Sequence, residues 1–266
     1  MKTNTIPTST LLLLVVLALL TFLLPFVLAF MLKKKYPNVK WSSFIVGCIM
    51  MILFAFVIES SIHNIVLNGP IGLTIMNSAF LYALYGGFMA GLFEESGRYI
   101  AFQYLLKKER EEDYNAIMYG LGHGGIEMIL IYSLSMVSNI VLISVINSGT
   151  DITTLAPGEA SQTITSAVQT LSNTPSYMYL LGFVERLSAL ILQVSLSIFV
   201  FMGVQHKKYI YVLYAFGIHF LVDFVVAYLS RSGFNMILLE VILLLCSLLI
   251  AYFSKQVFKK HHQSGS

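Results

Sequence analysis

Acidic, histidine and arginine side chains recur inside the long apolar segments of this chain, where burial in lipid would make each of them costly. Three of these segments contain, in order, Glu94, Glu95, Arg98, His123, Glu127, His219 and Asp223. Charged groups in a bilayer core are rare and usually mark a functional site. Carboxylates and imidazoles together can activate water, as a general base or as ligands of a metal ion. These residue types therefore predict a hydrolytic site.

The spacing of these residues places polar groups in pairs on one face of each helix. Four positions separate the members of three pairs: Glu94 and Arg98, His123 and Glu127, and His219 and Asp223. Residues four apart share a helix face, and a carboxylate one turn from a histidine can fix its ring and tautomer. With a rise of about 1.5 Å per residue, all three patches reach similar depths. We predict that they meet in one pocket in the inner half of the bilayer.

The charge balance of this group leaves two mechanisms open. If the histidines are neutral, the group contains four carboxylates and a single arginine. Carboxyl groups close together in a low-dielectric site cannot all be ionised. Either the carboxyl groups share protons and one acts as a general base, or a bound zinc ion acidifies a water molecule. The tentative metal ligands are His123, Glu127, His219 and Asp223. The spacing HExxH of ordinary zinc proteases is absent from the sequence.

A second set of polar residues lies nearer the opposite membrane face, and we interpret it as mainly structural. Its members are Glu59, His63, Glu185, Arg186 and Glu240. Consecutive residues face different directions on a helix, so we expect Glu185 and Arg186 to point apart. We expect Arg186 to pair with Glu59 or Glu240 across helices, with a role in substrate entry as the alternative. His63 is predicted to be solvated.

The composition requires most of the chain to lie in lipid. Of 266 residues, 57% are hydrophobic and 11% charged, whereas soluble domains carry about 25% charged residues. A spanning helix needs about 20 apolar residues. We predict an all-α fold, a single polytopic transmembrane domain over residues 1–266 with seven spans: 11–32, 41–67, 71–106, 115–147, 175–205, 208–230 and 234–258. The first run is too long for the core of a signal peptide.

The basic residues predict the orientation of these spans. Twelve of them fall in four segments at the ends of the spans that share one side of the membrane: Lys33, Lys34, Lys35, Lys40, Lys107, Lys108, Arg110, Lys207, Lys208, Lys255, Lys259 and Lys260. The other side holds only Lys2 and Arg231. Because cytoplasmic loops carry the excess of Lys and Arg, we predict an outside N-terminus and a cytoplasmic C-terminus. We expect the membrane to be a bacterial plasma membrane. No basic run provides a nucleic-acid footprint.

Two further patterns accompany the polar sites. In the outer connection 148–174, Ile164, Val168 and Leu171 recur at helical spacing and predict a short amphipathic helix on the outer leaflet, or a lid over the site. Glycines cluster around the polar positions: Gly87, Gly91, Gly97, Gly120, Gly122, Gly124 and Gly125. Close packing of helices is the favoured interpretation. Irregular backbone that binds substrate is the alternative.

The string Phe93 to Arg98, with Tyr119 to His123 and His219 to Asp223, resembles the pattern of the YhfC family of intramembrane metalloproteases. That family is similar to a wider clan of CAAX prenyl proteases and PrsW-like proteases. The resemblance covers the third to sixth spans. It implies that Glu94 activates water with support from Glu95 and Arg98. It also implies that His123 orients that water or binds metal.

The same resemblance implies that His219 and Asp223 bind metal or stabilise an oxyanion. The chain departs from the CAAX pattern at three points. The diacid motif is EExxR rather than EExxxR, Tyr119 stands in place of a phenylalanine, and Asp223 stands in place of an asparagine. An anionic aspartate cannot readily donate a hydrogen bond to an oxyanion, which favours a role for Asp223 in orienting His219 or binding metal. Glu127 has no counterpart in that pattern and also favours a metal.

Three functions remain open at this point. The first is an intramembrane peptidase whose partners are membrane lipid and a peptide or transmembrane-protein substrate. The second is a non-catalytic membrane scaffold, in which the polar residues serve a partner or the fold. The third is a proton- or cation-coupled transporter, which requires a continuous path between the two faces of the membrane.

Overall fold

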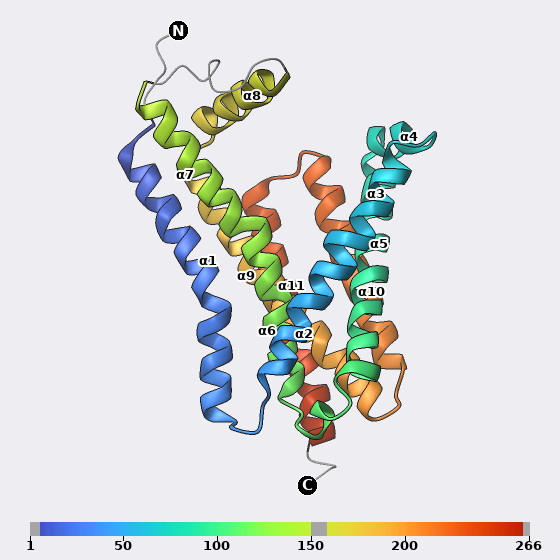
Figure 1. Ribbon diagram of the computed structural model, residues 1–266. Helices are drawn as coiled ribbons and strands as arrows, with labels where there is room; N and C mark the ends of the chain where they lie inside the picture. The colour runs from blue at the N-terminus through green and yellow to red at the C-terminus, as the bar shows by residue number, and fades with distance from the viewer. Residues whose placement is uncertain (1–5, 150–158, 263–266) are drawn as a thin grey trace.

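The computed structural model describes residues 6–149 and 159–262, and these form helices and short connections without strands (Figure 1). The helices of the first half are α1 (Thr8–Lys35), α2 (Trp41–Met51), η1 (Ile52–Glu59), α3 (Ser60–Leu67), α4 (Gly72–Asn77), α5 (Ala79–Ile100), η2 (Ala101–Leu105) and η3 (Glu109–Glu111). Those of the second half are α6 (Asn115–Met128), η4 (Ile129–Ser133), α7 (Leu134–Asn147), α8 (Glu159–Asn173), α9 (Ser176–Gln205), α10 (Ile210–Arg231) and α11 (Met236–His262). The fold is therefore all-α, as the sequence predicted.

Six continuous helices in the described residues are long and apolar enough to cross a membrane. They are Thr8–Lys35, Trp41–Leu67, Asn115–Asn147, Ser176–Gln205, Ile210–Arg231 and Met236–His262. The helix that carries the diacid, α5 with its extension η2, lies among them and is compatible with a seventh span. The chain is a polytopic transmembrane helix bundle, and the count of seven spans remains a prediction.

The expected continuous span 71–106 is broken near its start. Ser78 has an extended backbone (φ −113°, ψ 117°) that separates α4 from α5. Its hydroxyl accepts a hydrogen bond from the amide of Leu81 at 3.3 Å and so caps the first turn of α5. An N-cap serine satisfies an amide that the helix itself leaves free. The long span therefore begins at Ala79, and α4 is a separate short helix.

Three of the long helices contain π-helical stretches. These are η1 between α2 and α3, η2 at the end of α5, and η4 between α6 and α7. A π-helical turn inserts extra residues into a helix and is frequent at functional sites. Glu59 ends the first stretch, and Glu127 lies two residues before the last one. The stretches therefore change the direction of side chains next to two of the intramembrane carboxylates.

The glycines around His123 make α6 the helix that the others surround. A Cβ at Gly120 would lie 2.6 Å from Cα of Val194 in α9, and a Cβ at Gly122 would overlap the carbonyl of Phe44 in α2. A Cβ at Gly125 would lie 2.5 Å from Pro25 in α1. Small residues at helix contacts let the backbones approach closely. The structure thus supports the close-packing interpretation of these glycines.

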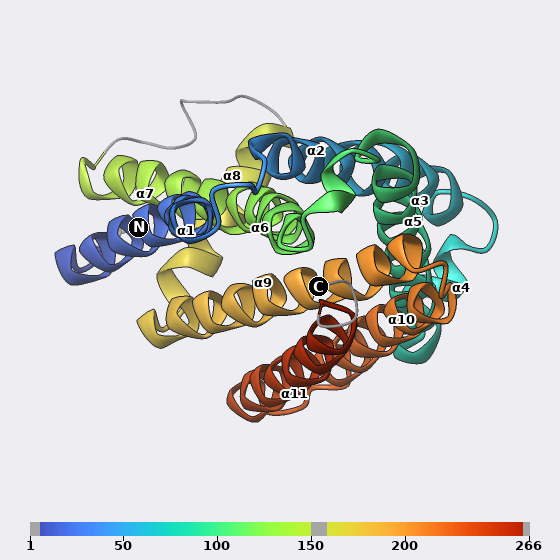
Figure 2. The same cartoon turned by 90° about the horizontal axis from the view of Figure 1, so that it is seen from below.

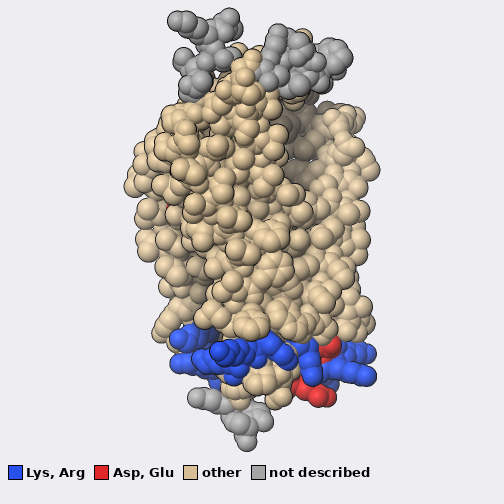
Figure 3. All heavy atoms as spheres, turned by 60° about the vertical axis from the view of Figure 1, so that its left-hand side comes forward, with Lys and Arg blue, Asp and Glu red and all other residues tan. Residues whose placement is uncertain are grey.

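The two ends of the bundle differ in charge and in packing. Lysines gather at the end that carries the C-terminus, which we call the lysine-rich face (Figure 3). Near this face a core packs around large buried side chains such as Phe102, Tyr119 and Phe201. Toward the opposite face, α1 and α7 diverge from α3, α5 and α10 (Figure 1). The bundle is therefore closed at the lysine-rich face and opens away from it.

The expected amphipathic helix is present as α8. Leu171 is buried, and Val168 packs with it against residues of α1 and α7. The rest of the predicted loop, residues 150–158, lies outside the described residues. Because α8 rests on the α1–α7 side, its described residues do not line the cavity presented below. This placement argues against the alternative of a lid over the site.

Candidate functional site

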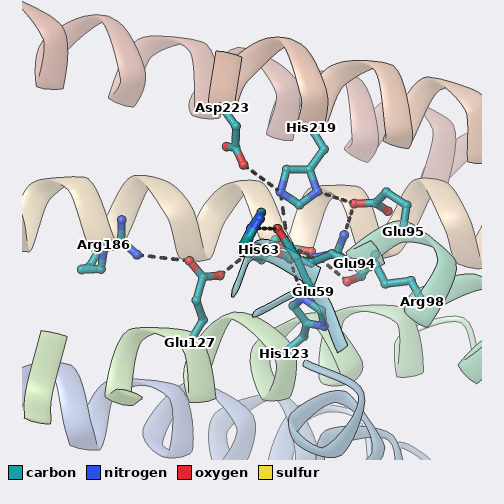
Figure 4. Close-up of polar contacts among 12 residues, drawn as sticks. Glu59, His63, Glu94, Glu95, Arg98, His123, Glu127, Arg186, His219 and Asp223 are labelled. Atoms are coloured by element: carbon teal, nitrogen blue, oxygen red, sulfur yellow. Dashed lines mark hydrogen bonds and ion pairs between the residues drawn. The ribbon is translucent and has the colours of Figure 1, made fainter. Parts of the chain in front are cut away.

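The intramembrane polar residues meet between α5, α6, α9 and α10 (Figure 4). Gly87 and Gly91 allow α10 to cross α5 closely, since a Cβ at Gly87 would lie 2.8 Å from the backbone of α10. On the other side, a Cβ at Gly124 would lie 2.9 Å from Cβ of Gln193 in α9. Close approach at these glycines brings short carboxylates and imidazoles within contact of one another. Glu94, Glu95, Arg98, His123, Glu127, His219 and Asp223 therefore form one connected group.

Glu94 is the centre of this group. Its Oε2 lies 2.9 Å from Nε2 of His123 and accepts a hydrogen bond from the Gln193 amide at 3.0 Å. The Arg98 guanidinium lies 3.6 Å from the same oxygen. Oε1 of Glu94 has no hydrogen-bond partner among the described side chains. One oxygen is therefore held firmly, and the other is left to receive a proton.

His219 is held between two carboxylates. Its Nδ1 lies 2.7 Å from Oε1 of Glu95, and its Nε2 lies 3.4 Å from Oδ2 of Asp223. The pairing with Asp223 is the one that the helical spacing predicted. Nε2 also lies 3.9 Å from Oε2 of Glu94. Partners on both ring nitrogens fix the orientation of an imidazole, so the ring is aimed at Glu94.

Gln193 connects the whole network, and the sequence analysis missed it. Its Oε1 accepts a hydrogen bond from Arg98, while its amide nitrogen donates to Glu94 and, at 2.7 Å, to Glu127. The side chain is buried within α9. The signal was present, because Gln193 lies seven residues after Arg186 and thus on the same helix face. A neutral amide between two carboxylates separates their charges.

Arg98 compensates the diacid from within the protein. It is completely buried and binds Glu95, with Glu94 one turn away. Neither Arg98 nor Glu95 lines the cavity, and His123 does not line it either. A buried charge is tolerated only with close partners. These three residues hold Glu94 and His219 in place from behind the cavity wall.

Arg186 differs from the sequence prediction in its partners. It binds Glu127 at 3.1 Å, and it also contacts the adjacent Glu185. The expected pairs with Glu59 or Glu240 are therefore wrong, and so is the expectation that Glu185 and Arg186 point apart. The cause is the length of the arginine side chain, which reaches along the helix as well as across to α6. Glu127 faces Arg186 and Gln193, not His123 on its own helix.

Glu59 and Glu240 occupy different surroundings. Glu59 lies 3.0 Å from Nε2 of His63, whose Nδ1 lies 2.9 Å from the Tyr85 hydroxyl. His63 is thus partly exposed, and Glu59 and Tyr85 are partners that the sequence analysis did not predict for it. Glu240 is buried in α11, and its Oε2 has no hydrogen-bond partner within the described part of the chain. Only Glu240 among the outer polar residues stands apart from the cavity lining.

One cavity of about 790 Å³ joins the two sets of polar residues. Glu94, Gln193 and His219 lie at its inner end, and its lining continues past Asp223 and Glu185 to Leu67 and Arg231. Leu67 and Arg231 end their helices at the face opposite the lysines. The sequence analysis did not predict the direction in which the cavity opens, which is toward the face opposite the lysines. The site is deep in the bundle and is reached from the other face.

The residues do not form a metal site in this arrangement. Among the residues that the structure describes, no group of three or more His, Cys, Asp and Glu side chains is placed to hold a metal ion. Of the tentative ligands, only His219 and Asp223 contact each other. His123 faces Glu94, whereas Glu127 is engaged by Gln193 and Arg186. Of the two carboxylates among these ligands, Glu127 is already paired with Arg186.

The sequence is similar to known proteins over most of its length. Residues 20–243 match the family described as YhfC intramembrane metalloprotease. An uncharacterized membrane protein, YhfC of Bacillus subtilis (strain 168), is 34% identical over 246 residues, which cover 90% of this chain and 94% of that protein. No solved structure matches the chain. The match spans the helices α5, α6, α9 and α10 that build the site.

Proposed function

This chain belongs to the YhfC intramembrane metalloprotease family, and we propose that it is a peptidase that cuts a membrane-embedded or membrane-associated protein. The observation that carries the proposal is Glu94, a buried carboxylate at the inner end of a cavity, with one oxygen held and the other free. A general base needs this combination of fixed position and access to water. The cavity is large enough for a segment of chain.

In the proposed reaction, Oε1 of Glu94 takes a proton from a water molecule, whose oxygen attacks the scissile carbonyl carbon. The carbonyl oxygen becomes an oxyanion, which Nε2 of His219 would stabilise, since it lines the cavity 3.9 Å from Oε2 of Glu94. Collapse of this intermediate breaks the C–N bond, and Glu94 returns the proton to the leaving amine. Glu95, Arg98 and His123 act as positioning residues.

The cavity also indicates how a substrate approaches. With the N-terminus outside and the C-terminus in the cytoplasm, Leu67 and Arg231 would lie at the outer face of a bacterial plasma membrane. The substrate would then enter from the outer half of the bilayer. The lining of Glu59, Glu185 and Arg186 belongs to this entrance, which favours the entry role over a purely structural one.

The description of the family as a metalloprotease implies a metal-dependent mechanism as the alternative. Zinc would require Glu127 or Glu94 to exchange its present partners for the ion, and no step above depends on such a change. Elemental analysis of purified protein, before and after a chelator, measures the metal directly. Stoichiometric zinc together with loss of activity after chelation would replace the glutamate mechanism by a metal mechanism.

The packing near the lysine-rich face bears on the transporter alternative. On that side of Glu94, the described side chains Phe102, Tyr119 and Phe201 are completely buried and packed together. A transporter needs a path that water or an ion can follow to both faces. The closed core favours a site with one entrance, as a hydrolase would have.

The test compares membranes that contain the wild-type protein, Glu94→Gln or the surface control Glu111→Gln. New protein N-termini are identified by mass spectrometry, and a candidate substrate is then incubated with purified protein in vesicles. We expect cleavage with wild type and Glu111→Gln, and none with folded Glu94→Gln. Equal products with all three proteins would contradict the proposal, and a lost partner without any cleavage would favour the scaffold.

A further inference from the structure

A second hollow lies on the other side of α9, between α1 and α11. It has a volume of about 540 Å³, within the range of about 300–1,000 Å³ usual for ligand sites. Residues of α6 and α9 form its floor, including Leu121 and Val194, and Leu28 and Ala251 stand on its two walls. Figure 2 shows α1 and α11 on either side of these floor helices. The hollow is separate from the cavity that holds Glu94.

Most of this groove offers no hydrogen bonds to a ligand. Its lining is largely aliphatic and aromatic, and the two serines within it form hydrogen bonds within their own helices. The Ser195 hydroxyl donates to the carbonyl of Ile191 at 2.7 Å, and the Ser254 hydroxyl donates to that of Ala251 at 3.0 Å. A hydrocarbon chain suits such a surface because it needs no polar partner.

The end of the groove at the lysine-rich face is different. Lys255 and Lys259 line it one helical turn apart, and both are exposed. Neither forms a hydrogen bond or an ion pair with the described residues. Nearby Lys33, by contrast, donates to the carbonyls of Pro37 and Val39. Two unpaired ammonium groups at the mouth of an apolar groove complement a phosphate attached to an acyl chain.

We propose that this groove binds an anionic phospholipid from the leaflet on the lysine-rich side. An acyl chain would lie along α6 and α9, and the phosphate would lie between Lys255 and Lys259. Basic pockets between transmembrane helices on the cytoplasmic side are suited to anionic headgroups. A bound lipid would link α1 to α11, which do not pack extensively against each other. The proposal does not depend on the proposed peptidase activity.

Native mass spectrometry of the full-length protein tests this site. The probes are phosphatidylglycerol and phosphatidylcholine with identical acyl chains, added in equal amounts. We expect the wild type to retain phosphatidylglycerol preferentially. The double variant Lys255→Gln/Lys259→Gln should retain it roughly 30-fold less, since each lysine near the surface contributes about a factor of five. The matched control Lys107→Gln/Lys108→Gln removes the same charge from the same face, away from the groove.

A third variant tests the apolar part of the groove. Ala251→Trp fills the space on the α11 wall without changing a charge, so it should weaken retention of both lipids while the lysines stay in place. Thermal unfolding confirms that each variant is folded. Equal retention of the two lipids by wild type would overturn the proposal. So would an equal loss in the two lysine doubles, because that result indicates only a general surface charge.

Discussion

The two ends of the Glu94 cavity stabilise charge in different ways. At the closed end, the side chain of Arg98 is completely buried and that of Glu95 is 3% exposed, and both have charged partners in the protein. At the open end, the side chains of Glu185 and His63 are 35% and 30% exposed. A buried charge depends on its partners because water cannot reach it. The closed end should therefore tolerate change far less than the open end.

The largest expected effect concerns catalysis at these two ends. Glu94→Gln keeps the shape of the side chain but removes the proton acceptor, and general bases typically contribute about 10²- to 10⁴-fold to rate. We expect cleavage in vesicles to fall by that factor. Glu185→Gln at the open end should change the rate less than tenfold. Similar losses of cleavage rate in both variants would show that the buried end is no more sensitive to substitution than the exposed end.

The next contrast concerns stability. Arg98→Ala removes the guanidinium partner of the buried carboxylates Glu95 and Glu94, and breaking a buried pair costs about 3–5 kcal/mol. Arg186→Ala leaves Glu127 with Gln193 still bound and with access to water in the cavity. We expect a clearly lower thermal unfolding midpoint for Arg98→Ala than for Arg186→Ala in detergent. Equal midpoints would mean that water also reaches the closed end.

Gln193 tests the link between the two ends. Gln193→Met keeps the length of the side chain but removes the hydrogen bonds to Glu94 and Glu127. A hydrogen bond to a charged group contributes about 1.5–3 kcal/mol, so cleavage should fall roughly 10- to 150-fold if the bond to Glu94 positions the base. A purely structural role would lower the unfolding midpoint and leave the pH profile of cleavage unchanged. We expect the pH profile to shift.

The convergence of the polar residues could be predicted because it depends on helical spacing. Glu94, His123 and His219 lie at similar depths in three apolar segments. Polar side chains in a membrane face the interior of the helix bundle and pair with one another, because contact with lipid is costly. The all-α fold could be predicted from the long apolar segments, because a helix satisfies its backbone hydrogen bonds internally in lipid. The pair of His219 with Asp223 was predicted from a separation of four residues, and the structure has it.

The individual partners could not be predicted, because they depend on helix crossings. His123 faces Glu94 on α5, not Glu127 on its own helix, since glycines bring α6 close to its neighbours. Long side chains add a second uncertainty, as with the reach of Arg186 to both Glu127 and Glu185. The opening of the cavity away from the lysines depends on the divergence of whole helices, which leaves no local pattern in the sequence.

The smallest expected effect distinguishes the two faces of α5 at adjacent glycines. A Cβ at Gly87 would lie 2.8 Å from the α10 backbone, whereas a Cβ at Gly86 meets nothing within 4 Å and faces the cavity. Gly87→Ala should destabilise by about 1–3 kcal/mol through overpacking. Gly86→Ala should be neutral or stabilise by up to about 1 kcal/mol, because alanine favours a helix over glycine. Thermal unfolding of both variants measures the difference. Gly87 lies where α5, which carries Glu95, crosses α10, which carries His219. We therefore also expect slower cleavage by Gly87→Ala but not by Gly86→Ala. Equal cleavage rates for the two variants would show that the packing at Gly87 does not position His219.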